Sequence, residues 1–143
     1  MKIGVSSCLL GINCKYNGQS NYNEGIKKLK ERYVLIPICP EVLGGLPTPR
    51  IPSEIQGHKV INKQGIDVTS NYHNGAQKAL QILKDNNISV VILKSKSPSC
   101  GKNKVYDGSF SNTLINGNGI AAKLFIDNNI TVYDENDYML YIK

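Results

Sequence analysis

Residues 2–8 have the sequence KIGVSSC, a short β-branched run that leads into a glycine- and asparagine-rich stretch from Gly11 to Asn21. The apolar residues of such a short run predict a buried strand that ends near Cys8. The pattern returns at residues 33–39, YVLIPIC, where the proline predicts weaker pairing toward the end of the strand. It returns again at residues 88–93, ISVVIL, just before the loop that contains Cys100. Each of these predicted strands therefore leads to a cysteine.

Helical segments are predicted between the strands. They cover residues 23–32, with Asn23 as a candidate N-cap, residues 70–86 and residues 117–128, and a fourth strand covers residues 130–133. Strands that alternate with helices predict an α/β fold, with a mostly parallel sheet and helices on both of its faces. Ligands of such sheets bind outside the carboxyl ends of the strands. The topology would gather Cys8, Cys39 and Cys100 at that edge.

Three other segments complete the predicted architecture. Residues 41–52 are rich in glycine and proline, which predicts a rigid loop without regular structure. Two short β-like runs at 59–61 and 66–69 predict a small β-hairpin insertion, and residues 135–143 are interpreted as a surface segment that finishes the chain.

The bulk properties predict one soluble domain over residues 1–143. A chain of 143 residues is long enough for a single core, and its 41% hydrophobic and 20% charged residues are ordinary for a globular protein. The first residues make neither a secretory signal nor a membrane span, so we expect the cytoplasm and no membrane partner. A net charge of +6 would suit nucleic acid. The lysines are scattered, however, and the dense run between Lys27 and Arg32 is better explained by a solvated helix face, which disfavours nucleic acid as a partner.

The chain has four cysteines, and thiols in the cytosol are kept reduced, so structural disulfides are not expected. A single buried cysteine is often only a small hydrophobic residue. Three at strand exits favour a metal or cluster site, and the absence of paired C-x2-4-C motifs disfavours zinc. Three thiolates would leave one iron of a [4Fe-4S] cluster open to a substrate atom. Cys14 remains an alternative fourth ligand, which would close the cluster and limit it to structural or electron-transfer roles.

Polar residues beside these cysteines are candidates for catalysis. Glu41 follows Cys39 by two residues and is a candidate general base, although it could equally be a loop carboxylate that pairs with Arg50. Ser97 and Ser99 precede Cys100 and could donate to a developing anion or relay a proton. Serines in proline-containing loops also commonly bond their own backbone.

Three motifs occur in order along the chain: CLLGINCKYNG at residues 8–18, CPEVLGGLPTPR at 39–50 and SPSCG at 97–101. Together with YDGSFS at 106–111, they resemble a bacterial family of long-unknown function that contains the [4Fe-4S]-dependent thiouracil desulfidases. Asn17 departs from the aspartate expected in the first motif.

The resemblance implies a Rossmann-like fold and an enzyme that removes sulfur from a thiolated pyrimidine base or nucleoside without net redox change. Cys8, Cys39 and Cys100 would hold the [4Fe-4S] cluster, and its open iron would take the thiocarbonyl sulfur. Glu41 would activate water or move protons, and Ser97 would assist, with Ser99 a weaker candidate for the same role. The products would be a uracil-like base and sulfide.

Two alternatives remain open at this point. The chain could be a non-catalytic basic α/β module that binds RNA or a nucleotide, in which the cysteines are merely buried. It could also be a thiol enzyme with Cys100 as nucleophile, although neither histidine lies at a recognisable partner position. The sequence leaves the natural substrate and the oligomeric state undetermined.

Overall fold

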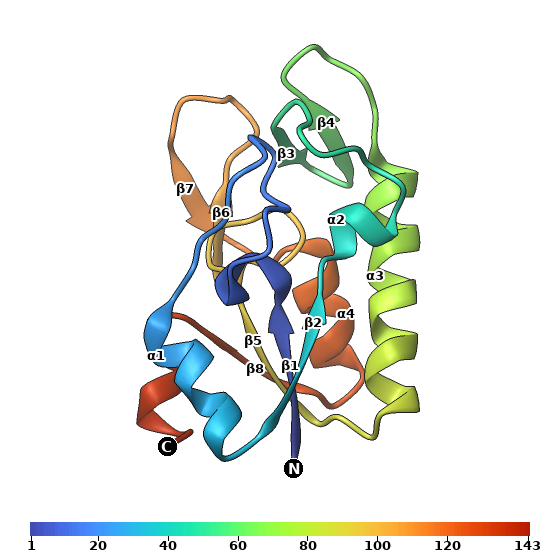
Figure 1. Ribbon diagram of the computed structural model, residues 1–143. Coiled ribbons are helices and arrows are strands. Elements are labelled where there is room, and N and C mark those ends of the chain that lie inside the picture. The colour runs from blue at the N-terminus through green and yellow to red at the C-terminus, as the bar shows by residue number, and fades with distance from the viewer.

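The computed structural model describes residues 1–143, and its centre is a four-stranded parallel sheet (Figure 1). The strand order is β2-β1-β5-β8, so the first strand of the chain lies inside the sheet. Every neighbouring pair is parallel, which confirms the predicted α/β class. The strands are β1 (Lys2–Ser6), β2 (Val34–Ile38), β5 (Val90–Leu93) and β8 (Thr131–Asp134).

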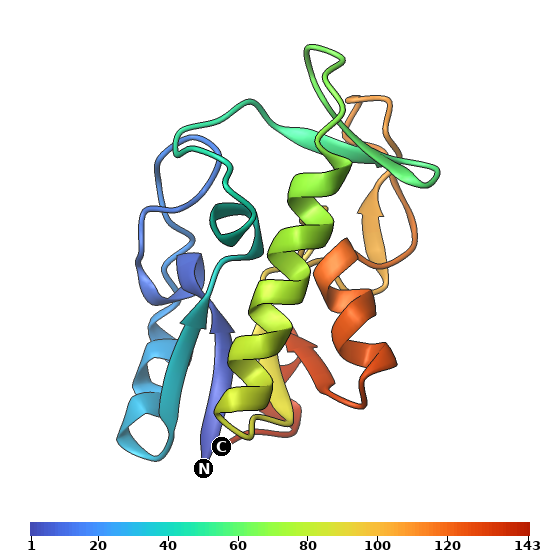
Figure 2. The ribbon, with the colours of Figure 1, turned by 90° about the vertical axis from the view of Figure 1, so that its right-hand side faces the viewer.

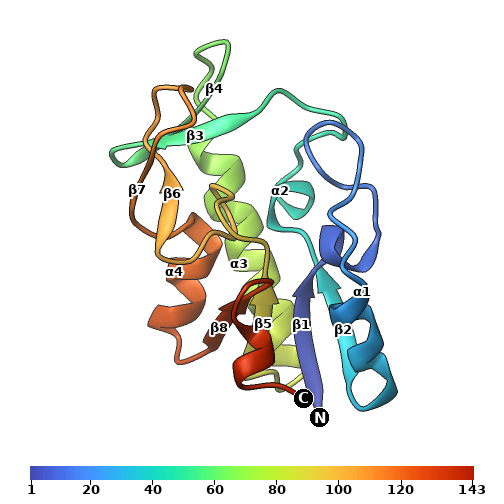
Figure 3. The same cartoon turned by 90° about the vertical axis from the view of Figure 1, so that its left-hand side faces the viewer.

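Helices cover both faces of the sheet, as predicted. The long helix α3 (Thr69–Asp85) and the shorter α4 (Ile120–Asp127) pack on one face (Figure 2). The opposite face carries α1 (Glu24–Lys27) and the 3-10 segments η2 (Lys28–Glu31) and η3 (Tyr138–Leu140) (Figure 3). An apolar core lies on each side of the sheet. None of the helices has the length and apolar character that crossing a membrane requires.

The segment predicted as one helix over residues 23–32 is α1 followed directly by η2. The Asn23 side chain accepts a hydrogen bond from the Ile26 amide at 3.0 Å, which confirms its role as N-cap. Ile26 and Leu29 are both buried against the sheet, so the change to 3-10 geometry leaves the apolar face in place.

The prediction of a mere surface segment at residues 135–143 is wrong. Tyr138 and Ile142 are each only 8% exposed and belong to the core under α1. The Asp134 carboxylate accepts the backbone amides of Asn136 and Asp137, which turns the chain back toward the sheet after β8. The tail therefore closes the second core.

Two short helices lie at the carboxyl edge of the sheet, which is the upper edge of the sheet in Figure 1. The 3-10 segment η1 (Ser7–Leu10) follows β1, and the single turn α2 (Pro40–Leu43) follows β2. Helix α2 corrects the prediction that residues 41–52 contain no regular structure. Pro40 occupies the first turn, where its fixed φ angle suits a helix and its missing amide leaves no donor unpaired.

Two antiparallel hairpins stand above this edge. They pair β3 (Ser53–Gln56) with β4 (Lys59–Asn62) and β6 (Lys104–Tyr106) with β7 (Leu114–Asn116). β4 pairs as a regular strand with β3, which precedes it. The Asn62 side chain accepts the amides of Gln64 and Ile66, and residues 66–68 then also pair with β4 through one antiparallel bridge and two backbone hydrogen bonds, so the predicted hairpin is present in part. The second hairpin was not predicted.

Helix α2 packs against α3 at two glycines, where the two backbones touch directly because no side chain lies between them. A Cβ atom on Gly75 would lie 1.8 Å from the Pro40 carbonyl oxygen, and one on Gly44 would lie 2.0 Å from the Asn71 carbonyl oxygen. Glycine is required at both positions because real side chains cannot approach backbone atoms so closely. This contact fixes the place of the segment that carries Cys39 and Glu41.

We expect Gly75→Ala to lower the free energy of unfolding by about 1–3 kcal/mol, because overpacking displaces α2. Helix propensity alone would give the opposite sign, a gain of about 1 kcal/mol. Chemical denaturation measures the difference. The matched control Asn74→Ala, exposed on the same helix, should change stability by less than about 0.5 kcal/mol. A Gly75→Ala protein as stable as the control would show that the close contact is not needed.

Candidate functional site

The cysteines predicted to converge do lie around one cavity, of about 540 Å³, at the carboxyl edge of the sheet. Cys8 lies in η1 just after β1, and Cys39 is the residue between β2 and α2. Cys100 lies in the loop after β5, where it is buried. The parallel topology brings these thiols together, because three adjacent strands end at the same edge.

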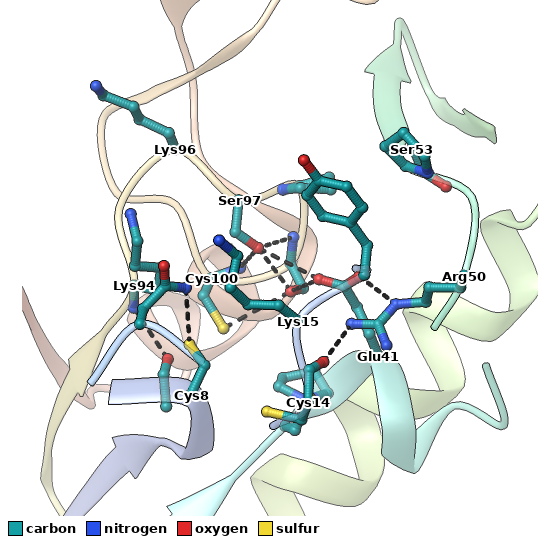
Figure 4. A pocket seen from close by; sticks show the side chains of 18 of the residues that line it. Cys8, Cys14, Lys15, Glu41, Arg50, Ser53, Lys94, Lys96, Ser97 and Cys100 are labelled. Carbon is teal, nitrogen blue, oxygen red and sulfur yellow. Dashed lines mark hydrogen bonds and ion pairs between the residues drawn. The ribbon is translucent and has the colours of Figure 1, made fainter. Parts of the chain in front are cut away.

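Cys14, the alternative fourth ligand, also lines the cavity. The loop that contains it folds back on η1, since the Asn21 amide donates to the Cys8 carbonyl at 3.0 Å. Figure 4 shows the Cys14 side chain beside the space that Cys8 and Cys100 also face. All four thiols of the chain therefore surround the same space.

The four thiols differ in their affinity for the proton. Hydrogen bonding from the Cys14 thiol lowers the pKa of Cys8 and of Cys39 to about 7 each, against the opposing effect of burial. The neighbouring thiols, with burial, raise the pKa of Cys14 well above its ordinary value, so Cys14 holds its proton in preference to Cys8 and Cys39. Burial raises the pKa of Cys100 to about 12, against the opposing effect of the nearby Ser6 and Ser99 hydroxyls.

These differences predict a distinct alkylation pattern in reduced, cluster-free protein. Because the thiolate is the nucleophile, the rates at Cys8 and Cys39 should rise to half their maximum at about pH 7, while Cys100 stays unreactive. Iodoacetamide labelling followed by mass spectrometry measures each site. In Cys14→Ala the donor is lost, and both midpoints should move up toward the ordinary 9.0. Four cysteines that titrate together in both proteins would contradict this account.

Both carboxylate oxygens of Glu41 are hydrogen-bonded within the site. Its Oε1 accepts the Tyr72 hydroxyl at 3.0 Å and Nε of Arg50 at 3.1 Å. Its Oε2 accepts the Ser99 hydroxyl at 2.8 Å and lies 3.4 Å from the Ser97 hydroxyl. One oxygen is thus fixed by an ion pair and a phenol, and the other is linked to the serines on the cavity wall.

Glu41 forms the ion pair with Arg50 that the sequence offered as an alternative, and it also lines the cavity. Nη2 of Arg50 also donates to the Cys14 carbonyl at 2.9 Å, and the Arg50 amide donates to the Tyr16 carbonyl. The guanidinium therefore joins α2 to the loop that carries Cys14. It holds the carboxylate in one orientation.

The serine loop is held by the first turn of α4. Backbone amides of Ile120 and Ala121 donate to the Pro98 and Ser99 carbonyls, each at 2.9 Å. The Ser97 hydroxyl accepts the Cys100 amide at 3.1 Å and lies 2.9 Å from the Ser99 hydroxyl. Ser97 therefore bonds the backbone of its own loop and also lies next to the Glu41 carboxylate. The result is a continuous chain of polar atoms from Ser97 through Ser99 to Glu41.

Several residues of the site were not among the candidates named from the sequence. Tyr72 lies on α3, and its hydroxyl donates to Glu41; burial is the main cause that raises its pKa. Asn21 donates to the Cys8 sulfur at 3.4 Å. Lys94, which lines the cavity, pairs with Glu135 at 2.9 Å, and Lys102, shortly after Cys100, pairs with Asp137.

The family model of the 2-thiouracil desulfurases matches residues 3–137, a span that includes every residue of this site. The chain belongs to the 2-thiouracil desulfurase family. Within the curated proteins it is 43% identical to the uncharacterized protein YbbK of Bacillus subtilis strain 168, over 93% of this chain and 95% of that protein. Among solved structures it is similar to the [4Fe-4S]-dependent thiouracil desulfidase TudS, with a TM-score of 0.92 and 38% identity. That alignment covers 97% of this chain and 93% of the other, so the desulfurase family also accounts for the fold.

Proposed function

We propose that the protein is a [4Fe-4S]-dependent desulfidase that removes sulfur from a thiolated pyrimidine, a thiouracil-like base or nucleoside, and releases sulfide. Membership of the 2-thiouracil desulfurase family and similarity to a [4Fe-4S]-dependent thiouracil desulfidase support this activity. The observation that carries the proposal is local to this chain. Cys8, Cys39 and Cys100 line the same cavity as Glu41, Ser97 and Ser99.

The donor set suits an iron–sulfur cluster. Cysteine thiolates are the ligands such clusters use, and the lowered pKa of Cys8 and of Cys39 makes two of these thiolates available near neutral pH. No three Cys, His, Asp or Glu side chains are arranged to hold a single metal ion. A cluster does not require that arrangement, because each thiolate binds a different iron. Cys8, Cys39 and Cys100 would hold it, and an iron without a cysteine ligand would supply a Lewis acid for the thiocarbonyl sulfur.

The proposed reaction is a hydrolysis. Water adds its oxygen to the ring carbon, the carbon–sulfur double bond is replaced by a carbon–oxygen double bond, and both water protons end on the released sulfide. No electrons are gained or lost, because the oxygen that joins the carbon and the sulfur that leaves it have the same oxidation state. The residues of the site must therefore move protons and position the ring.

Glu41 would accept the proton from the attacking water at Oε2, which faces the serines. Arg50 and Tyr72 keep Oε1 occupied, so the carboxylate cannot rotate away without losing both contacts. The Ser99 and Ser97 hydroxyls, 2.9 Å apart, would pass a proton along the wall toward the departing sulfur. This arrangement gives the acid and base steps to one carboxylate and two hydroxyls.

The test is product analysis with anaerobically purified, cluster-loaded protein. Incubation with 2-thiouracil, 4-thiouracil and their nucleosides, without added reductant, should yield sulfide and the matching oxo-pyrimidine in equal amounts from at least one of them. Uracil and uridine serve as controls that release no sulfide. Cluster-loaded protein that releases no sulfide from any thiopyrimidine would overturn the proposal.

A further inference from the structure

A buried carboxylate outside the Glu41 network also lines the cavity. Glu54 lies in β3 and is only 9% exposed. Its Oε1 accepts two backbone amides, from Gly108 at 3.0 Å and from Phe110 at 3.1 Å. Its Oε2 accepts no hydrogen bond, and Glu54 takes part in none of the ion pairs of the protein. No buried side-chain oxygen of the protein lacks a partner, so Oε2 is open to the cavity, where a ligand can donate a hydrogen bond to it.

The hydrogen bonds from the Gly108 and Phe110 amides to Glu54 hold the Phe110 side chain at the same cavity. Phe110 lines the cavity and has φ of 58°, in the left-handed region. Four of the six non-glycine residues with positive φ are asparagines, which tolerate this conformation; the others are Phe110 and Lys96, and both line the cavity. Strained backbone that the surroundings hold in place is typical of ligand-binding loops. Tyr106 and Pro98 give the same cavity further flat surfaces.

We propose that Glu54 and Phe110 form the subsite that recognises the pyrimidine ring, with a ring N–H donating to Oε2 of Glu54 and the ring stacking against Phe110. This inference rests on the proposed function and specifies how its substrate is held. A glutamine at position 54 could accept the same two backbone amides with its side-chain oxygen. Holding this loop therefore does not by itself require the charged carboxylate of Glu54. A substrate with an N–H group next to its thiocarbonyl explains it, because thiouracils carry such a group.

The chemistry predicts a preference that the cluster alone would not impose. Thiopyrimidines with a free ring N–H should be preferred over the same rings methylated on that nitrogen. Flat aromatic thioamides should be preferred over open-chain thioamides, because only a flat ring can stack. Both preferences would come from Glu54 and Phe110 on the cavity wall, whereas Glu41 and the serines would act on the thiocarbonyl itself.

The test compares two variants with matched controls in cluster-loaded protein. Glu54→Gln keeps an oxygen for the two amides but can replace the Oε2 acceptor with a donor, so KM for thiouracil should rise about tenfold or more while kcat changes little. Methylation of one ring nitrogen should weaken wild-type binding by a similar factor and leave Glu54→Gln almost unaffected. Phe110→Leu should also raise KM, whereas Phe110→Tyr, which keeps the ring, should not.

Equilibrium dialysis with uracil and N-methyluracils, which are not turned over, measures the same discrimination without catalysis. Circular dichroism melting curves separate a binding defect from a folding defect. Active protein in which Glu54→Gln and Phe110→Leu keep wild-type KM and the same discrimination against N-methylation would refute the subsite and leave the desulfidase intact. Wild-type protein that discriminates in dialysis but releases no sulfide would refute the desulfidase and retain the subsite.

Discussion

Glu41→Gln is expected to lower kcat for sulfide release by about 10²- to 10⁴-fold, the range that a general base contributes, while the protein keeps its cluster. Glutamine has nearly the same shape, and its amide oxygen can still accept from Arg50 and Tyr72. The group that faces Ser99 would then donate a hydrogen bond where Glu41 Oε2 accepts one, so the site would lose its base. Sulfide release under saturating thiouracil, with the absorbance spectrum of the same sample, measures both properties.

Tyr72→Phe is the matched control for this variant. It removes one hydrogen bond of about 1 kcal/mol from Oε1 and leaves the base in place, so kcat should fall by less than about tenfold. The proposed role of Glu41 predicts a wide gap between the two variants. Wild-type kcat in Glu41→Gln would remove the carboxylate from the mechanism.

Replacement of a proposed cluster ligand is expected to have the other large effect. Alanine at Cys8, Cys39 or Cys100 should reduce iron and acid-labile sulfide from about four per chain to nearly none, because the remaining thiolates cannot hold the cubane. Sulfide release should be lost with them. Colour, iron analysis and electron paramagnetic resonance after anaerobic purification measure the outcome.

Cys14→Ala is the decisive comparison, since Cys14 lies against Cys8 and Cys39 but keeps its proton in cluster-free protein. We expect this variant to retain iron and activity. If it loses the cluster as completely as Cys39→Ala does, four thiolates close the cluster and the open iron has no basis.

The parallel sheet and the edge at which the site lies are predictable from sequence because they depend on local patterns. Three β-branched runs, separated by helical segments, leave one parallel arrangement with the carboxyl ends together. Cys8 and Cys39 lie just after their strands and Cys100 lies in the loop that follows the third, so the edge at which the strands end also determines where these cysteines meet.

Other parts of the site depend on contacts that no local pattern encodes. Cys14 reaches the cavity only because Asn21 donates to the Cys8 carbonyl and folds the loop back. Tyr72 has the helical spacing of a core residue, and only the close approach of α2 at Gly75 brings Glu41 to its hydroxyl. Residues 135–143 lack a strong period, yet Tyr138 and Ile142 fill a core that the sheet leaves open.

The most direct test of the whole account is sulfide release from thiouracil by the same protein before cluster removal, after removal with a chelator, and after anaerobic reconstitution with iron and sulfide. We predict activity in the first sample, loss of activity with loss of iron in the second, and recovery of both in the third. Cluster-free protein that releases sulfide at the original rate would contradict the central claim.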